Sequence, residues 1–488
     1  MDLASLQRRT AFIGVFSTIV GVLIAFTSYY DGINADTAVA YMNGLIRWTP
    51  FMWGQDRYGM LIPALTSAIA SPLANVIVQN VLHIAMSCAC FFLLAQFLFP
   101  GSKAIEIGLL SLFGYLFLSG LPDVKEYLSP WQIYTPAMMF GLLALLALPV
   151  SWGLALPLAL VAAWCNFAIF VLLALLVLAR TLEVIGKAEE GLRWRTTLAK
   201  QTLLLVIMAL AGHILKSPYT PSGTSDYTFL PFIQAIQGWI RLALDYGADL
   251  NWTSLWLPFF PAVMGVCALF FFMAFGHTSR RREHQEALRS FIVGICSALA
   301  YAMVVGGTTF AQFNGFPRRY LIPSLMIWVV AWTGLFLHFV PLTANLRRAQ
   351  KLIGSMILIP LLMLRFGPPS PTRVQQALEK RFQPVYAQIP SSCTHLAGDY
   401  YRVWDSVFYS RISGRPPLWG ITYRADVVRD LWSLERFRKP RVCYWRDNEN
   451  EAAKILEQFG LRHLRKVKDG LHMVELEVKV AAGAPEMK

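Results

Sequence analysis

Long apolar stretches separated by short polar ones dominate the first three quarters of the sequence, and a different pattern begins at Phe366. A helix that spans a bilayer needs about 17–25 mostly apolar residues. By that measure about eleven stretches predict spanning helices: 11–28, 75–99, 104–120, 133–150, 153–165, 167–180, 201–216, 254–276, 290–306, 320–340 and 352–364. The pattern predicts an all-α polytopic membrane bundle over residues 1–365, with a first outer loop at residues 29–74.

After residue 365 the charged residues become more frequent and the long apolar runs cease. Helices are expected at Asp399–Arg411 and Asn450–Phe459, and strands at Leu418–Tyr423, Arg441–Trp445, Leu464–Lys468 and Leu471–Val478. The last two strands flank Asp469-Gly470, which is a strong hairpin turn signal. Residues 366–488 are therefore predicted to form a soluble α/β domain.

The distribution of basic residues predicts the orientation of the bundle. The chain is 56% hydrophobic and 15% charged, whereas soluble domains have about 25% charged residues. With the N-terminus inside, the inner loops hold about twice as many Lys and Arg as the outer loops, as the positive-inside rule requires. The C-terminal domain then lies outside. The net charge of +14 is explained by contact with anionic lipid head groups, and no motif indicates nucleic-acid binding.

Two of the seven cysteines, Cys393 and Cys443, lie in the C-terminal domain. In an oxidising outer compartment these two could pair. The other five lie in or beside apolar segments and are interpreted as packing residues. No Cys or His spacing resembles a metal site, so no cofactor is predicted. Binding of a divalent cation remains an alternative, because the outer aspartates could also bind a hard cation.

The first outer loop contains three aspartates, Asp31, Asp36 and Asp56. Carboxylates at the mouth of a membrane helix are costly and often mark a functional site. Asp36–Trp48 predicts an amphipathic helix along the membrane surface with Asp36 in its first turn, and residues 57–69 predict a second one with Asp56 at its start. The plain alternative is that both aspartates only cap helix N-termini. Asp31 is closer to the spanning helix and is interpreted as structural.

A second polar cluster, Arg318-Arg319-Tyr320, lies between two predicted spans on the outer face. Two adjacent arginines there run against the orientation rule. The planar guanidinium suits phosphate oxygens, and a tyrosine can sit at the membrane interface. Arg57 and Lys216 are further cations in this outer layer. The alternative for all of these residues is ordinary contact with lipid head groups.

Three short runs carry a resemblance to a known family: Asn34–Tyr41, Arg318–Pro323 and Gly398–Trp404. With the early acidic loop and the outer C-terminal domain, the chain resembles the GT-C superfamily of polytopic glycosyltransferases. That superfamily includes protein mannosyltransferases and the bacterial aminoarabinose transferase for lipid A. The resemblance implies that Asp36 occupies the position of the catalytic acid. Family members often have a second acid directly after it, whereas this chain has Thr37, so that role passes to Asp56 or is absent.

The resemblance also implies roles for the two later runs. Arg318–Pro323 is similar to the late phosphate-binding element of the family. Gly398–Trp404 is similar to a part of the C-terminal domain that caps the site in bacterial members. A multi-pass protein of the bacterial inner membrane with a periplasmic C-terminal domain is therefore expected.

The expected reaction moves a sugar from a polyprenyl-phosphate donor to an acceptor hydroxyl, with inversion at the anomeric carbon. Asp36 would act as general base, with Asp56 as a second catalytic acid. The donor phosphate would be bound by Arg318, Arg319, Tyr320, Arg57 and Lys216. The expected partners are this lipid-linked donor, a lipid, glycan or protein acceptor, and membrane lipids. The hypothesis requires Asp36 and the two arginines to converge on one extracytoplasmic pocket.

Two other classes of membrane protein compete with this hypothesis. A polymerase or ligase of lipid-linked glycans would use a diphosphate donor and a functional loop late in the chain. A flippase or transporter of lipid-linked sugars would show internal repeats and ionisable residues inside its spans. The sequence shows an early acidic loop, few charges within the spans and no repeat, which favours the transferase. A structural or receptor-like role is a third alternative.

Overall fold

The computed structural model describes residues 3–27, 29–30, 33, 35–46, 48–52, 59–101, 103–129, 134–166, 169–185, 191–216, 228–248, 262–263, 265–267, 281–313, 318–339, 357–422, 441–458, 461–469 and 472–480. The chain divides into two compact units. Unit 1 consists of Met1–Ile24, Val81–Pro218 and Ser222–Gly367, and unit 2 is formed mainly by Ala25–Asn80 and Pro368–Lys488. The first outer loop therefore belongs to the same unit as the C-terminal domain.

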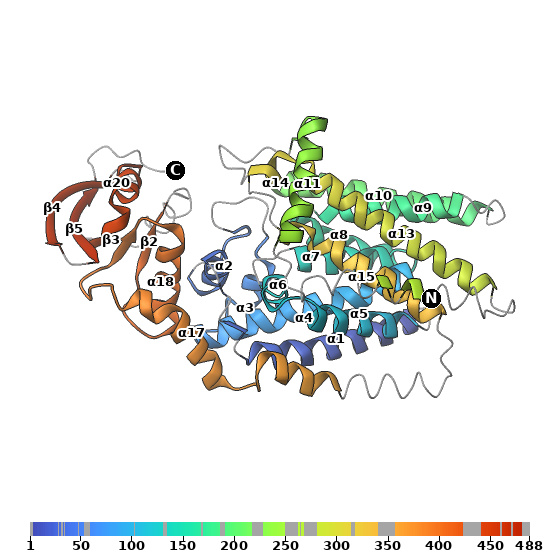
Figure 1. Cartoon of the computed structure of the whole chain (residues 1–488), viewed down its shortest axis with the longest axis horizontal. Coiled ribbons are helices and arrows are strands. Elements are labelled where there is room, and N and C mark those ends of the chain that lie inside the picture. The colour runs from blue at the N-terminus through green and yellow to red at the C-terminus, as the bar shows by residue number, and fades with distance from the viewer. Residues whose placement is uncertain are drawn as a thin grey trace. The chain divides into compact units, whose positions relative to one another are not determined.

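Unit 1 is helical. Its elements are α1 (Leu3–Ala25), most of α4 (Pro72–Leu98), α5 (Ala104–Leu118), α6 (Leu121–Tyr127), α7 (Tyr134–Ala147), α8 (Trp152–Cys165), α9 (Ile169–Ile185), α10 (Gly191–Lys216), α11 (Phe232–Ala248), α13 (Arg281–Gly306), α14 (Thr309–Phe313), the 3-10 helix η4 (Arg318–Leu321) and α15 (Ile322–Phe339). Residues 357–366 are also helical. The helices α8, α9, α10 and α13 run lengthwise in the bundle, with α13 packed against α9 and α15 (Figure 1).

The predicted spans agree with these helices. Every predicted span coincides with a helix except 254–276, which lies outside the described residues apart from 262–263 and 265–267. Within the described part of the chain, five helices are long and apolar enough to cross a membrane: α1, α4, α10, α13 and α15. The helices α5, α7, α8 and α9 are apolar but shorter. The chain is thus built as a polytopic membrane protein, while the count of eleven and the orientation stay predictions.

Helix α4 is longer than a bilayer requires. Its 27 residues span about 40 Å at 1.5 Å per residue, against about 30 Å of hydrocarbon. Asn75, Gln79 and Asn80 in its first turns are fully buried polar residues and belong to unit 2. The predicted span at 75–99 therefore includes residues that serve the packing of unit 2.

The C-terminal part of unit 2 contains a five-stranded sheet. Its strands are β1 (His395–Ala397), β2 (Trp419–Ile421), β3 (Arg441–Trp445), β4 (Leu461–Asp469) and β5 (Met473–Val480), in the order β2-β1-β3-β5-β4. β1 is parallel to β2 and β3, whereas β5 is antiparallel to β3 and β4. The helices of this region are α17 (Pro371–Tyr386), α18 (Tyr400–Ile412), the 3-10 helix η5 (Arg446–Asn448) and α20 (Glu449–Gln458) (Figure 1).

The early part of unit 2 contains α2 (Ala35–Leu45) and α3 (Leu61–Thr66). Helix α2 is buried on nearly all sides and packs against α18 and α3, so protein covers its apolar positions. Its place along the membrane surface stays a prediction. The ring of Tyr41 stacks on that of Phe408 at a centroid distance of 5.4 Å. The apolar positions of α2 therefore face protein that lies much later in the sequence.

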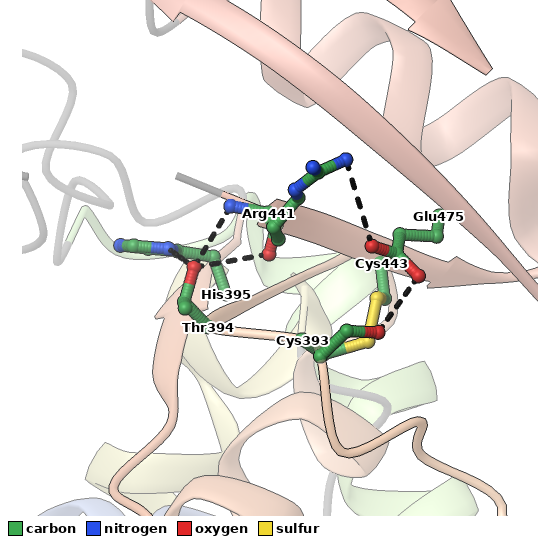
Figure 2. The surroundings of a disulfide bond; sticks show 7 residues. Cys393, Thr394, His395, Arg441, Cys443 and Glu475 are labelled. Carbon is green, nitrogen blue, oxygen red and sulfur yellow. Dashed lines mark hydrogen bonds and ion pairs between the residues drawn. A yellow bond between two sulfur atoms is a disulfide. The ribbon is translucent and has the colours of Figure 1, made fainter. Parts of the chain in front are cut away.

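A disulfide joins Cys393 to Cys443, the two cysteines that the sequence places in the C-terminal domain (Figure 2). Cys393 precedes β1 and Cys443 lies in β3, so the bond crosses from one strand to its neighbour. Polar contacts link the same strands beside the disulfide. Ser392 Oγ donates to Glu475 Oε2 at 2.8 Å, and Arg441 pairs with the same carboxylate at 3.8 Å. The disulfide fixes the chain at the start of β1 to the centre of the sheet.

Candidate active site

Asp36 lies in the first turn of α2 and is half-buried. A carboxylate is stabilised there by the partial positive charge of the helix N-terminus. The hydroxyl of Tyr400 donates a hydrogen bond to Asp36 Oδ1 at 3.0 Å, and Tyr400 itself is only 2% exposed. Tyr400 is the first residue of α18, so this bond ties the early acidic loop to the C-terminal domain within unit 2.

The residues just before Tyr400 explain why it points to α2. Gly398 has a φ of +124°, a conformation that favours glycine. Asp399 then caps α18, and its side chain accepts a hydrogen bond from the backbone N–H of Arg402 at 2.9 Å. The turn at Gly398 and the cap at Asp399 fix where α18 begins, and this places Tyr400 against Asp36.

A second link holds the segment that leads into α2. Arg381 on α17 donates from Nε to the backbone carbonyl of Ile33 at 3.2 Å. Its Nη2 pairs with Asp405 Oδ2 on α18 at 3.3 Å. Ile33 precedes Asp36 by three positions, so Arg381 holds the entry to α2 while Tyr400 holds its first turn.

Asp405 has an unusual environment for a carboxyl group. The residue is buried, and this burial raises the pKa of its carboxyl to about 7, although the Arg381 guanidinium opposes the shift. Among the described residues, no partner satisfies Asp405 Oδ1. The link between Arg381 and the acidic loop therefore contains a group that changes charge near neutral pH.

Buried polar contacts also fix the other side of α2. The Tyr41 hydroxyl donates to Asn80 Oδ1 at 2.7 Å. Gln79 donates from Nε2 to Asn75 Oδ1 at 2.6 Å and to the Tyr41 carbonyl at 3.3 Å. These contacts join α2 to the first turns of α4. Because both sides of α2 are held, Asp36 has a defined position, as a general base requires.

The late cluster lies in unit 1. Arg318 and Arg319 begin the 3-10 helix η4, which packs against α6, α11, α13 and α15. Tyr320 is buried in an apolar cluster with Leu230, Ala235 and Ala311, so it packs inside the protein rather than at an exposed interface. The structure does not describe the side chains of Arg318, Arg319 and Lys216. Three further predicted residues lie entirely outside the described part of the chain: Asp31, Asp56 and Arg57. Since Asp36 belongs to unit 2, its convergence with the two arginines stays a prediction.

Three residues of the site were not singled out from the sequence: Tyr400, Arg381 and Asp405. Tyr400 lies within Gly398–Trp404, and the resemblance of that run to the family is the one feature of the sequence that points to it. Arg381 lies on α17, for which the sequence predicts no helix, and Asp405 lies in the predicted helix Asp399–Arg411 but belongs to no motif that indicates a function. Among the described residues, no group of three or more His, Cys, Asp or Glu side chains is placed to hold a metal ion.

Comparison with known proteins supports the fold. No protein-family model matches the sequence, and no curated protein does. Among solved structures, the chain is similar to the crystal structure of ArnT from Cupriavidus metallidurans bound to undecaprenyl phosphate. The sequences are 11% identical, the match covers 96% of this chain and 97% of that chain, and the TM-score is 0.52. The chain therefore has the fold of that ArnT structure.

Proposed function

We propose that the chain is a membrane glycosyltransferase that moves a sugar from a polyprenyl-phosphate donor to an acceptor hydroxyl. The observation that carries this proposal is the position of Asp36, held in the first turn of α2 by Tyr400 at 3.0 Å. The fold gives further support, because the chain is similar to ArnT, a protein whose crystal structure contains undecaprenyl phosphate. The reaction takes place on the periplasmic side of a bacterial inner membrane, where the C-terminal domain also lies.

In this reaction Asp36 is the general base. The acceptor oxygen attacks the anomeric carbon of the donor sugar while its proton passes to the Asp36 carboxylate. The bond between the anomeric carbon and the phosphate oxygen breaks, and its electron pair leaves with the polyprenyl phosphate. One direct displacement inverts the anomeric configuration. Tyr400 donates to one carboxylate oxygen and so fixes the orientation of the group during proton transfer.

The donor phosphate requires cations rather than a general acid, because a phosphate is already a tolerable leaving group. Arg318 and Arg319 are the proposed partners of its oxygens, since the guanidinium fork matches phosphate geometry. Arg57 and Lys216 assist in donor binding, whereas Tyr320 packs in the apolar cluster and holds η4, which carries the two arginines. Asp56 takes the part of the second acid that the family often has directly after the first.

The experiment that tests the function identifies the lipid product. The purified chain in lipid nanodiscs is incubated with sugar-labelled polyprenyl-phosphate donors and an extract of native membrane acceptors. The proposal predicts one polyprenyl monophosphate released for each sugar transferred. Release of a polyprenyl diphosphate from diphosphate donors would instead identify the polymerase or ligase alternative. If sealed vesicles showed donor movement across the bilayer without any bond cleavage, the chain would be a flippase.

A further inference from the structure

The sheet of unit 2 has a topological switch point. The chain leaves β1 through α18 to β2 on one side, and β3 then lies on the other side of β1. From β3 the chain continues away from β1, through α20 to β4 and β5. In open α/β sheets, ligands bind in the crevice outside the carboxyl ends of two such strands, because the two following loops separate there. The carboxyl ends of β1 and β3 are therefore the place to look for a ligand site.

A cavity of about 620 Å³ lies at this edge. Small-molecule sites commonly measure about 300–1,000 Å³. It is lined by Arg402 from the first turn of α18, by Trp445, Arg446 and Asp447 at the end of β3, and by His472 and Gln388. His472 precedes β5, and its carbonyl accepts a hydrogen bond from the Arg446 backbone N–H at 3.0 Å. The cavity is thus formed by the loops that the strand order brings together.

The two loops at the crevice are tied to each other. Arg402 donates from Nη1 to both carboxylate oxygens of Asp447, at 2.8 and 3.0 Å. With its side-chain amide oriented to satisfy both neighbours, Asn448 accepts from the Asp399 backbone N–H at 2.9 Å and donates to Glu451 at 3.0 Å. These contacts connect the two loops that form the walls of the crevice, so the crevice is formed without a ligand.

Arg402 contributes hydrogen-bond donors to this crevice. Arg402 uses Nη1 for Asp447, and within the described part of the chain no partner is recorded for its Nε and Nη2. Its guanidinium carbon lies 5.9 Å from the ring centre of Trp445. Trp445 is 2% exposed, and its indole N–H has no acceptor among the described residues. This N–H is enclosed by protein, so the donors that the crevice offers to a ligand are those of Arg402.

We propose that this crevice binds a phosphate or carboxylate group carried by a sugar. Arg402 holds the oxyanion through the Nε and Nη2 edge of its planar guanidinium. Gln388 can both donate to and accept from the sugar hydroxyls. The volume is larger than a lone phosphate needs and fits a monosaccharide with its charged substituent. This proposal goes beyond the transfer reaction and does not depend on Asp36.

Hydrogen–deuterium exchange of the full chain in phosphatidylcholine nanodiscs tests the proposal. The probes are glucose 1-phosphate, glucuronate, inorganic phosphate and neutral glucose, each at millimolar concentration. The two charged sugars are expected to slow exchange several-fold in peptides covering 398–403 and 445–451, and glucose is not. Equal protection by glucose and glucose 1-phosphate, or no protection of these peptides by any probe or anionic lipid, would overturn the proposal.

Variants assign the effect to the crevice. Arg402→Ala is expected to abolish the protection, and Arg402→Lys to weaken it because a lysine keeps the charge without the fork. Arg373→Ala removes an exposed arginine of α17 outside the cavity and is the matched control. Asp447→Asn keeps one oxygen that can accept from Arg402 but removes the negative charge that competes with the ligand, so binding is expected to become tighter. Loss of protection in Arg373→Ala, or loss in a folded Asp447→Asn protein, contradicts the assignment.

The source of the oxyanion is distinguished by changing the lipid. If phosphatidylglycerol nanodiscs alone protect the two peptides, and Arg402→Ala removes that protection, the group recognised is a lipid head group. If only the soluble sugar phosphate or sugar acid protects them, the ligand is a free or glycan-linked one. The first outcome contradicts a sugar-linked ligand, although Arg402 still binds an oxyanion, and the second supports the proposal.

Discussion

The Tyr400 hydroxyl donates to Asp36 Oδ1 at 3.0 Å, although 364 positions separate the two residues in the sequence. The first turn of α18 and the first turn of α2 therefore form one structure. A substitution in the C-terminal domain can thus change the position of a carboxylate in the first outer loop. On this account the C-terminal domain is part of the proposed active site and not an appended module.

Tyr400→Phe tests that relationship directly. The substitution removes one hydroxyl and keeps the buried ring, so the fold is expected to persist. Hydrogen bonds to charged groups contribute about 1.5–3 kcal/mol, and kcat is therefore expected to fall roughly tenfold or more. The KM for the lipid donor is expected to stay unchanged. Tyr401→Phe, at an exposed neighbouring position, is the control, and wild-type kcat in Tyr400→Phe would refute the positioning role.

Arg318→Ala and Arg319→Ala test the proposed phosphate contacts. Loss of a charge-assisted contact to the donor phosphate is expected to raise the KM for the polyprenyl-phosphate sugar about tenfold. Steady-state kinetics with varied donor concentration measures this change, with Arg373→Ala as the control arginine. If the double variant shows the same dependence on donor concentration as the wild type, the arginines only contact lipid head groups.

Asp405→Asn tests the pH dependence of unit 2. Burial raises the pKa of Asp405 from an ordinary 3.8 to about 7. Between these two pH values the folded protein therefore binds more protons than the unfolded chain. The contribution of this group to stability is therefore fully present below about pH 4 and is lost as the pH rises toward 7.

The measurement for Asp405 is the free energy of unfolding of the full chain at several pH values between 4 and 8. The wild type is expected to lose stability relative to Asp405→Asn over this range, because an amide does not titrate. Parallel curves for the two proteins would show that Asp405 has an ordinary pKa.

Removal of the disulfide is expected to destabilise the C-terminal sheet. The bond between Cys393 and Cys443 closes a loop with a sequence separation of 50. Disulfides of this kind contribute about 2–4 kcal/mol. Replacing both cysteines by serine should lower the urea midpoint of unfolding, whereas Cys267→Ser, at an exposed free cysteine, should not. Equal midpoints for the two variants would argue against a stabilising bond.

The sequence predicted the apolar helices of unit 1 because burial in lipid requires a long apolar run that can be recognised without knowing its partner. It did not predict α6, α11 and α14. At α2 it predicted the helix but not the protein partner of its apolar positions. Those positions contact α18, and no local pattern reports a partner so distant in the sequence. It also missed α17, although the buried residues Val374, Ala377, Leu378 and Phe382 follow the spacing of an amphipathic helix.

The residues of the candidate site were also predictable only in part. Asp36 could be singled out because a carboxylate beside a spanning helix is unusual. Arg381 and Asp405 could not, since an arginine and an aspartate on polar helices are ordinary until tertiary packing buries one of them.

The most direct test of the proposed function measures sugar transfer by Asp36→Asn, with Asp36→Glu beside it. Asparagine keeps the size of the side chain and can still accept the Tyr400 hydrogen bond, but it cannot take a proton. General base catalysis contributes about 10²–10⁴-fold, so the Asn variant is expected to lose at least about a hundredfold in rate while it still binds the lipid donor. Asp36→Glu should keep part of the activity. Transfer at the wild-type rate by Asp36→Asn would contradict the account.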